Sequence, residues 1–148
     1  MARGCSVAVL ALAWMTSGSR AAEPPQAPAE PNLEKRARLA LDESDAAFDA
    51  ARSHYREGDT GGVESDAARI ADSANLALLS LNQTGKDPRK SPHWFKIAEI
   101  RMRGLLRKLE TLEREMDFAD RPMIEKAKTE VERVHDKLLL GLLEGKPK

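Results

Sequence analysis

Cysteine is nearly missing from this 148-residue chain, because Cys5 is the only one. Cys5 falls in a leader that we expect to be removed, so the mature protein would contain none. Disulfides are then excluded, and packing must supply the stability even in an oxidising compartment. Cys5 also stands at the start of the apolar run of the leader instead of at its end, which argues against lipid attachment there.

Motifs for catalysis and cofactor binding are missing as well. The chain has no Gly-x-Ser-x-Gly, His-Glu-x-x-His, glycine-rich phosphate loop or Cys-x-x-Cys-His haem site. The step from Glu132 to His135 places a carboxylate and an imidazole on one helical face, but a di-metal bundle needs two such steps and two more glutamates. We therefore expect no enzymatic activity, no cofactor and no metal, and we interpret His135 as a surface histidine.

The apolar run at residues 5–15 is about half of the roughly 20 residues that a membrane-spanning helix needs. It follows a short basic start at Arg3 and precedes small residues that end in Ser19-x-Ala21. This order is typical of a secretory signal peptide. We predict a signal peptide over residues 1–21 and an exported protein, periplasmic or extracellular. The alternative is an uncleaved N-terminal anchor.

The segment that follows is rich in proline. Residues 23–31 contain four prolines and no large apolar side chain, so we expect residues 22–31 to form an extended tether. The remaining residues, 32–148, are sufficient for one domain with a single core.

An excess of charge of one sign is missing too, because 24 basic side chains balance 24 acidic ones. No overall field attracts nucleic acid or acidic lipid. The charges are unevenly placed, however: residues 42–72 hold nine acids and three bases, whereas residues 86–108 hold eight bases and two acids. We expect these two segments to face one another in the fold. A partner of opposite sign is the alternative.

Apolar residues recur at helical spacing from Asn32 onward, with stop signals between four segments. Gly58 ends the first segment, residues 59–62 form a turn, and Ser91 and Asp120 cap the third and fourth helices. The predicted helices span about residues 33–57, 63–83, 92–118 and 121–143.

The last two predicted helices have regular apolar seams, in the steps of three and four that are typical of heptads. These seams are Ala98, Met102, Leu105, Leu109, Leu112 and Met116, and then Ile124, Ala127, Val131, Val134, Leu138 and Leu142. The short link between the two helices requires an antiparallel hairpin. We predict an all-α fold, an antiparallel up-down four-helix bundle of two helical hairpins. The rival is a pair of hairpins that closes only on dimerising.

At the far end of this hairpin, apolar residues are no longer confined to one face, and such a helix must be covered on more than one side. The simplest interpretation is that the first two helices or the loop at 84–92 cover them. The alternative is a surface for another protein or for self-association. This candidate interaction surface comprises Trp94, Ile97, Ile100, Leu139, Leu140 and Leu143.

A narrow basic stripe flanks the seam of the third helix and consists of Lys96, Arg103, Arg107 and Arg114. Such a candidate anion-binding stripe suits an anionic polymer or a membrane surface. Glu99 and Glu110 precede Arg103 and Arg114 by four residues, which predicts ion pairs within the helix and a solvated, self-paired face. No aromatic residues interleave with these bases, which argues against nucleic-acid binding.

The segment Tyr55-Arg56-Glu57-Gly58-Asp59 resembles the turn between the two helices of a tetratricopeptide repeat. The resemblance covers these five residues. It implies a tetratricopeptide-like adaptor, which we keep as an alternative function.

These features predict an exported, non-enzymatic helical bundle that acts through a surface as an accessory, scaffold or interaction protein. The main alternative is a periplasmic binding module or chaperone-like protein that uses the basic third helix for anionic or unfolded ligands. The expected partner is another protein or a second copy of the chain.

The signal peptide gives a direct prediction. Protein expressed with residues 1–21 attached should leave the cytoplasm and begin at Ala22, because the small residue Ala21 permits cleavage after it. N-terminal sequencing of the exported fraction measures this. Retention in the cytoplasm, or an exported protein that still begins at Met1, contradicts the prediction.

Overall fold

The computed structural model describes residues 27–145. Over this range the chain has a short 3-10 turn, η1 (Ala27–Ala29), and four helices: α1 (Leu33–Glu57), α2 (Thr60–Gln83), α3 (His93–Glu115) and α4 (Pro122–Glu144). No strand occurs within that range, which confirms the prediction of an all-helical, four-helix bundle. In the same part of the chain no helix has the length and apolar character to cross a membrane. The predicted signal peptide lies outside the described residues.

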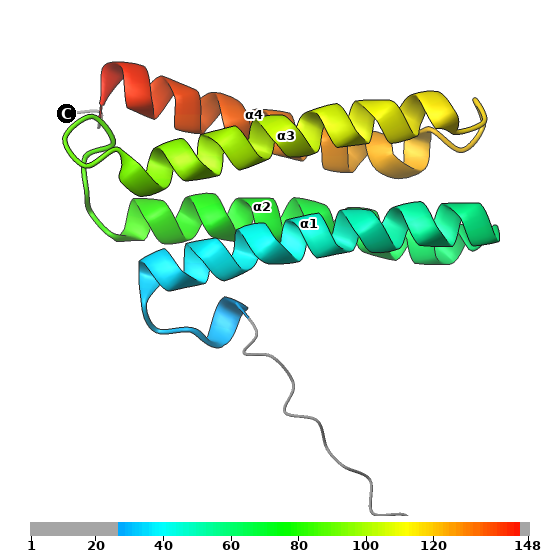
Figure 1. The fold of residues 1–148 in the computed structure, drawn as a ribbon, viewed down its shortest axis with the longest axis horizontal. Coiled ribbons are helices and arrows are strands. Elements are labelled where there is room, and N and C mark those ends of the chain that lie inside the picture. The colour runs from blue at the N-terminus through cyan, green and yellow to red at the C-terminus, as the bar shows by residue number, and fades with distance from the viewer. Residues whose placement is uncertain (1–26, 146–148) are drawn as a thin grey trace, which may run out of the picture.

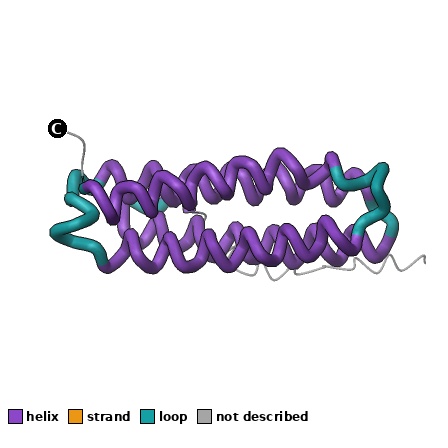
Figure 2. The backbone as a smooth tube through the Cα atoms, turned by 90° about the horizontal axis from the view of Figure 1, so that it is seen from above, coloured by secondary structure: helices purple, strands orange, loops and turns teal. Residues whose placement is uncertain are grey.

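The helices lie side by side in an elongated bundle of two layers (Figure 1 and Figure 2). α1 and α2 form one layer and α3 and α4 form the other, and α2 packs against α4 while α1 packs against α3. The α1–α2 turn and the α3–α4 loop lie at one end of the bundle. The loop at 84–92 lies at the opposite end, beside the last turn of α4.

Each helix contributes one apolar stripe to a core that all four helices share. The whole predicted seam of α3 is buried, and the predicted seam of α4 is buried as far as Leu138, with Leu142 half-buried against the core. On α1 and α2 most of the buried side chains are alanine or serine, and these small side chains let the two helices pack closely. The stripes meet within one chain, where α2 packs against α4 and α1 packs against α3.

The predicted turn at 59–62 is wrong, because Thr60, Gly61 and Gly62 are the first residues of α2. Asp59 is the N-cap residue, and its side chain accepts the Gly62 N–H at 3.0 Å. This bond satisfies one of the free amides at the start of the helix and offsets the weak helical preference of the glycines.

The predicted caps of the last two helices are wrong as well. α3 begins at His93 and α4 at Pro122, so the N-cap residues are Pro92 and Arg121 instead of Ser91 and Asp120, and neither helix has a side-chain cap bond. α3 also ends at Glu115, before the predicted Phe118, since Met116 has an extended backbone with ψ 146°.

The end of the predicted tether is not extended. Ala27 belongs to η1 and is buried in the core. Glu30 holds this segment on α1: its carboxylate pairs with Lys35 Nζ at 2.7 Å, and its carbonyl oxygen accepts the Arg36 Nε–H at 2.7 Å. Residues 27–29 are therefore helical instead of extended, while residues 22–26 lie outside the described range.

The acidic and basic segments face one another between α1 and α3, as predicted. Arg101 donates to Asp42 at 2.6 Å and to Asp45 at 2.6 Å, and Lys108 pairs with Asp45 at 2.9 Å. Because these pairs are partly exposed, they position the two layers more than they add to stability.

Leu105 and Ile100 lie on different faces of α3 and should respond differently to truncation. Leu105→Ala should lower the free energy of unfolding by about 2–5 kcal/mol, because Leu105 is fully buried and its loss leaves a cavity. Ile100→Ala, at a 56% exposed position, should change it by less than about 0.5 kcal/mol. Urea denaturation followed by circular dichroism measures both. Equal losses would contradict this assignment of the core face.

Candidate functional site

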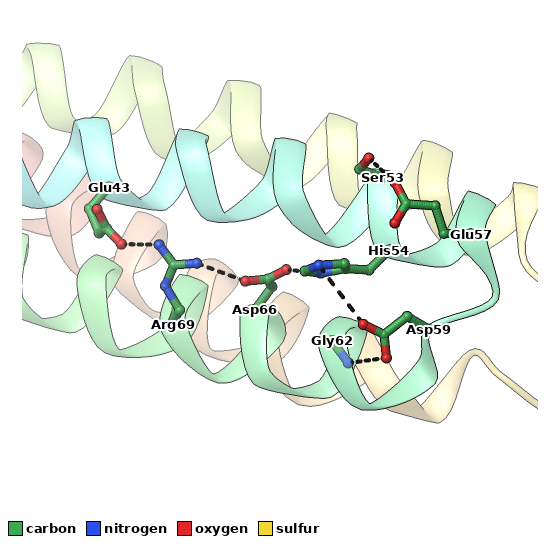
Figure 3. A network of polar contacts seen from close by, with 8 residues as sticks. All are labelled: Glu43, Ser53, His54, Glu57, Asp59, Gly62, Asp66 and Arg69. Carbon is green, nitrogen blue, oxygen red and sulfur yellow. Dashed lines mark hydrogen bonds and ion pairs between the residues drawn. The ribbon is translucent and has the colours of Figure 1, made fainter. Parts of the chain in front are cut away.

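A chain of polar contacts crosses the α1–α2 layer beside the turn that joins the two helices (Figure 3). Gly58 ends α1 with a φ of +76°, a left-handed conformation that suits glycine and reverses the chain direction. Gly62 leaves room for the imidazole of His54, because a Cβ there would lie 2.6 Å from His54 Cγ. The turn therefore brings the end of α1 against the first turns of α2.

Asp66 is the centre of this network and is only 3% exposed. One carboxylate oxygen accepts the Nδ1–H of His54 at 2.7 Å, and the other accepts an Nη1–H of Arg69 at 2.8 Å. Arg69 continues to Glu43 on α1, and His54 Nε2 lies 3.9 Å from Asp59 Oδ2. The buried carboxylate thus has a partner on each oxygen, which offsets the cost of removing it from water.

The network favours a charged imidazole. The hydrogen bond to Asp66 raises the pKa of His54, and desolvation opposes this rise. A histidine–carboxylate pair serves catalysis when its second ring nitrogen faces a nucleophile. Here that nitrogen faces Asp59, and the nearby Ser53 hydroxyl donates instead to Glu57 at 2.9 Å. We interpret the network as a link between α1 and α2.

A second histidine–carboxylate pair links α3 and α4. His135 Nε2 lies 3.1 Å from Glu99 Oε1, and Arg103 Nε lies 3.5 Å from the same oxygen. The side chain of His135 is 16% exposed, so its interpretation as a surface histidine is wrong. Glu99 lies on the buried side of α3 and gives the imidazole a partner there. No set of three or more His, Cys, Asp or Glu residues in the 27–145 range is placed to hold a metal ion.

The candidate interaction surface divides into a covered and an exposed part. Trp94 packs partly against the core, and Ile97 is half-buried. The other four side chains are exposed to water and form what we call the exposed apolar end: Ile100, Leu139, Leu140 and Leu143.

A groove of about 690 Å³ opens beside Leu140, between α2 and α4. Its floor consists of apolar side chains from three helices and the 84–92 loop: Leu78, Phe95, Leu138 and Pro88. Gly141 lets the loop approach α4, because a Cβ there would lie 3.3 Å from Pro88 Cγ. The loop thus covers one side of α4, as the simplest interpretation expected, and leaves an open groove of ligand-pocket size next to it.

The candidate anion-binding stripe lies on α3 and is only partly self-paired. Arg103 pairs with Glu99 as predicted. Arg114 does not pair with Glu110, and its guanidinium donates to the Thr111 hydroxyl at 3.5 Å. Within residues 27–145, Lys96 and Arg107 have no ion-pair partner, so these two cations are available to an anion.

Sequence reasoning missed the two buried acids, although their spacing carried a signal. Asp66 lies three residues after Val63 and four before Ile70, on the buried stripe of α2. Glu99 lies four residues after Phe95 on the buried side of α3. An acid at a position that the helical period buries needs a hydrogen-bonding or cationic partner from a neighbouring helix, and a histidine can be that partner.

Comparison of the chain with models of protein families, with curated proteins and with solved structures finds no match. The function is therefore argued from the exposed apolar end, the groove and the charges of the bundle itself.

The His54–Asp66 pair predicts a pH dependence of stability. The folded chain raises the pKa of His54 above its ordinary value of 6.5, so this stabilisation is complete below about pH 6.5 and is lost as the pH rises through the folded-state pKa. His54→Gln should flatten the fall in the urea midpoint between about pH 6 and about pH 9. His93→Gln, at an exposed position, is the matched control and should keep the wild-type slope. An unchanged profile in His54→Gln would contradict this role.

Proposed function

We propose that this protein is an exported, non-enzymatic bundle that acts as an accessory, scaffold or interaction protein through its exposed apolar end. In this proposal a cleaved signal peptide at residues 1–21 directs the chain to the periplasm or the outside of the cell. An antiparallel up-down bundle of two helical hairpins then presents the surface. Its partner is another protein or a second copy of the chain.

The observation that carries the proposal is the position of Leu140 on the wall of the groove. Single exposed leucines are common on soluble proteins. Leu140 and Leu143, however, are 52% and 67% exposed, and Leu140 borders a concave surface with an apolar floor. Exposed apolar side chains beside an apolar hollow are typical of sites that receive an anchoring side chain from a partner.

The positions of the two histidine–carboxylate pairs support a non-enzymatic role. His54 and Asp66 pair between α1 and α2, and His135 and Glu99 pair between α3 and α4. None of these groups lines the groove. These groups therefore contact one another between helices, away from the surface that is open to a ligand.

A second candidate function is the binding of anionic or unfolded ligands along α3. The observation that favours it is that Lys96 and Arg107 have no ion-pair partner among the described residues. Binding of an anion to such a stripe weakens steeply with added salt, whereas contact with leucines does not. The salt dependence of binding therefore separates this function from the first.

Replacement of Leu140 and Leu143 by serine tests the first function. The double variant should melt at nearly the wild-type temperature, because both side chains are exposed. When the double variant is used as bait in affinity capture from the exported fraction, it should fail to capture a protein that the wild type captures. Mass spectrometry identifies the captured proteins, including an untagged copy of this chain.

Leu79→Ser is the matched control for this experiment. Leu79 is 52% exposed, as Leu140 is, but it lies on α2 and does not line the groove. This variant should capture what the wild type captures. The proposal is overturned if all baits capture the same proteins. It is also overturned if the free energy of unfolding of the double variant falls by several kcal/mol, because the leucines would then belong to the core.

A further inference from the structure

Phe118 has the most exposed large apolar side chain of the described residues, at 85%. It lies in the α3–α4 loop, with Asp117 and Asp120 on either side of it in sequence. The loop is ordered by hydrogen bonds: the Tyr55 hydroxyl accepts the Asp117 N–H at 2.8 Å, and the Asp120 N–H donates to the Asp117 carbonyl at 2.9 Å. The Arg121 guanidinium carbon lies 5.8 Å from the ring centroid. This end of the bundle therefore presents a fixed aromatic knob with two neighbouring carboxylates.

The groove is complementary to this aromatic knob in polarity and in charge. Its floor is apolar, and its lining includes Lys137, the acid Glu144, and Lys86, which already pairs with Glu34 at 2.6 Å. Lys137 has no ion-pair partner within the described range. Arg89 adds a further cation next to the groove, since a Cβ on the lining residue Gly145 would lie 3.0 Å from Arg89 Cδ. An apolar hollow with cations at its edge suits an aromatic ring that is flanked by carboxylates.

The α3–α4 loop, which carries Phe118, and the 84–92 loop, which lines the groove at Pro88, lie at opposite ends of the bundle (Figure 1 and Figure 2), so the knob and the groove cannot meet within one chain. They can meet between copies, with the α3–α4 loop of one copy docked on the groove of the next. Such a contact leaves one groove and one knob free, so further copies can add in the same way at either end. A symmetric pair of grooves would instead bring the lysines of two copies together, which like-charge repulsion opposes.

We propose that this protein assembles head to tail, through insertion of Phe118 of one copy into the groove of the next. The inference rests on the proposed function, because it names the occupant of the same groove. One aromatic side chain and its neighbouring ion pairs bury less than the roughly 1,200 Å² of a stable interface. The contact is therefore weak, depends on concentration, and weakens further as salt screens the ion pairs.

Two complementary variants test the assembly. Phe118→Ser removes the knob and keeps the groove, whereas Leu140→Asp keeps the knob and places a repelling carboxylate at the groove. In sedimentation velocity over a concentration series, the purified exported wild type should grow into chains. Each variant alone should bind itself at least about tenfold more weakly. An equal mixture of the two should form a 1:1 dimer that does not grow, because it holds one intact knob and one intact groove.

The assembly test has a matched control at an exposed leucine outside the groove. Leu79→Ser should associate as the wild type does, and circular dichroism should show that each variant is folded, since all three positions are exposed. A wild type that is monomeric at every concentration overturns the assembly, even if capture finds a different partner and so upholds the proposed function. Association that survives both substitutions, or a mixture that stays monomeric, overturns it as well.

Discussion

A helix in a four-helix bundle buries one stripe of side chains, and the last turns of α4 carry more leucine than one stripe holds. Leu138 takes the buried position and Leu142 packs partly against the core. The period of 3.6 residues then directs Leu139, Leu140 and Leu143 to other faces, where they are exposed. The exposed apolar end therefore follows from helix geometry, and both the first proposed function and the head-to-tail assembly depend on this excess of leucine.

The polar pairs play a different part from the leucines. Asp66 and Glu99 are buried acids, and each meets a histidine from the other helix of its own hairpin. An alanine-rich stripe alone distinguishes poorly between positions one turn apart, whereas a buried acid finds its partner in one position only. We interpret these pairs as the contacts that fix how the helices align, while Arg101 positions one layer on the other. The ends of the bundle are thereby held in fixed places.

Much of this fold could be predicted from the sequence, because the seams of α3 and α4 repeat in steps of three and four from Ala98 to Leu138. The start of α2 could not, since Gly61 and Gly62 favour a turn locally and only the Asp59 cap and the room needed by His54 explain a helix there. The same periodicity identified the leucines at the end of α4 as more than one face can bury, but the expectation that neighbouring segments cover them fails for Leu139, Leu140 and Leu143. The groove could not be predicted, because it depends on Pro88 approaching Gly141 across a large separation in sequence.

The exposure of the α4 leucines is tested most directly by methyl NMR of leucine-labelled protein in the presence of a soluble paramagnetic chelate, at a concentration where the protein is monomeric. The methyl signals of Leu140 and Leu143 should broaden strongly, while those of Leu105 and Leu138, which are buried, should remain sharp. Protection of the Leu140 and Leu143 signals to the same degree as that of Leu138 would contradict the existence of an exposed apolar end.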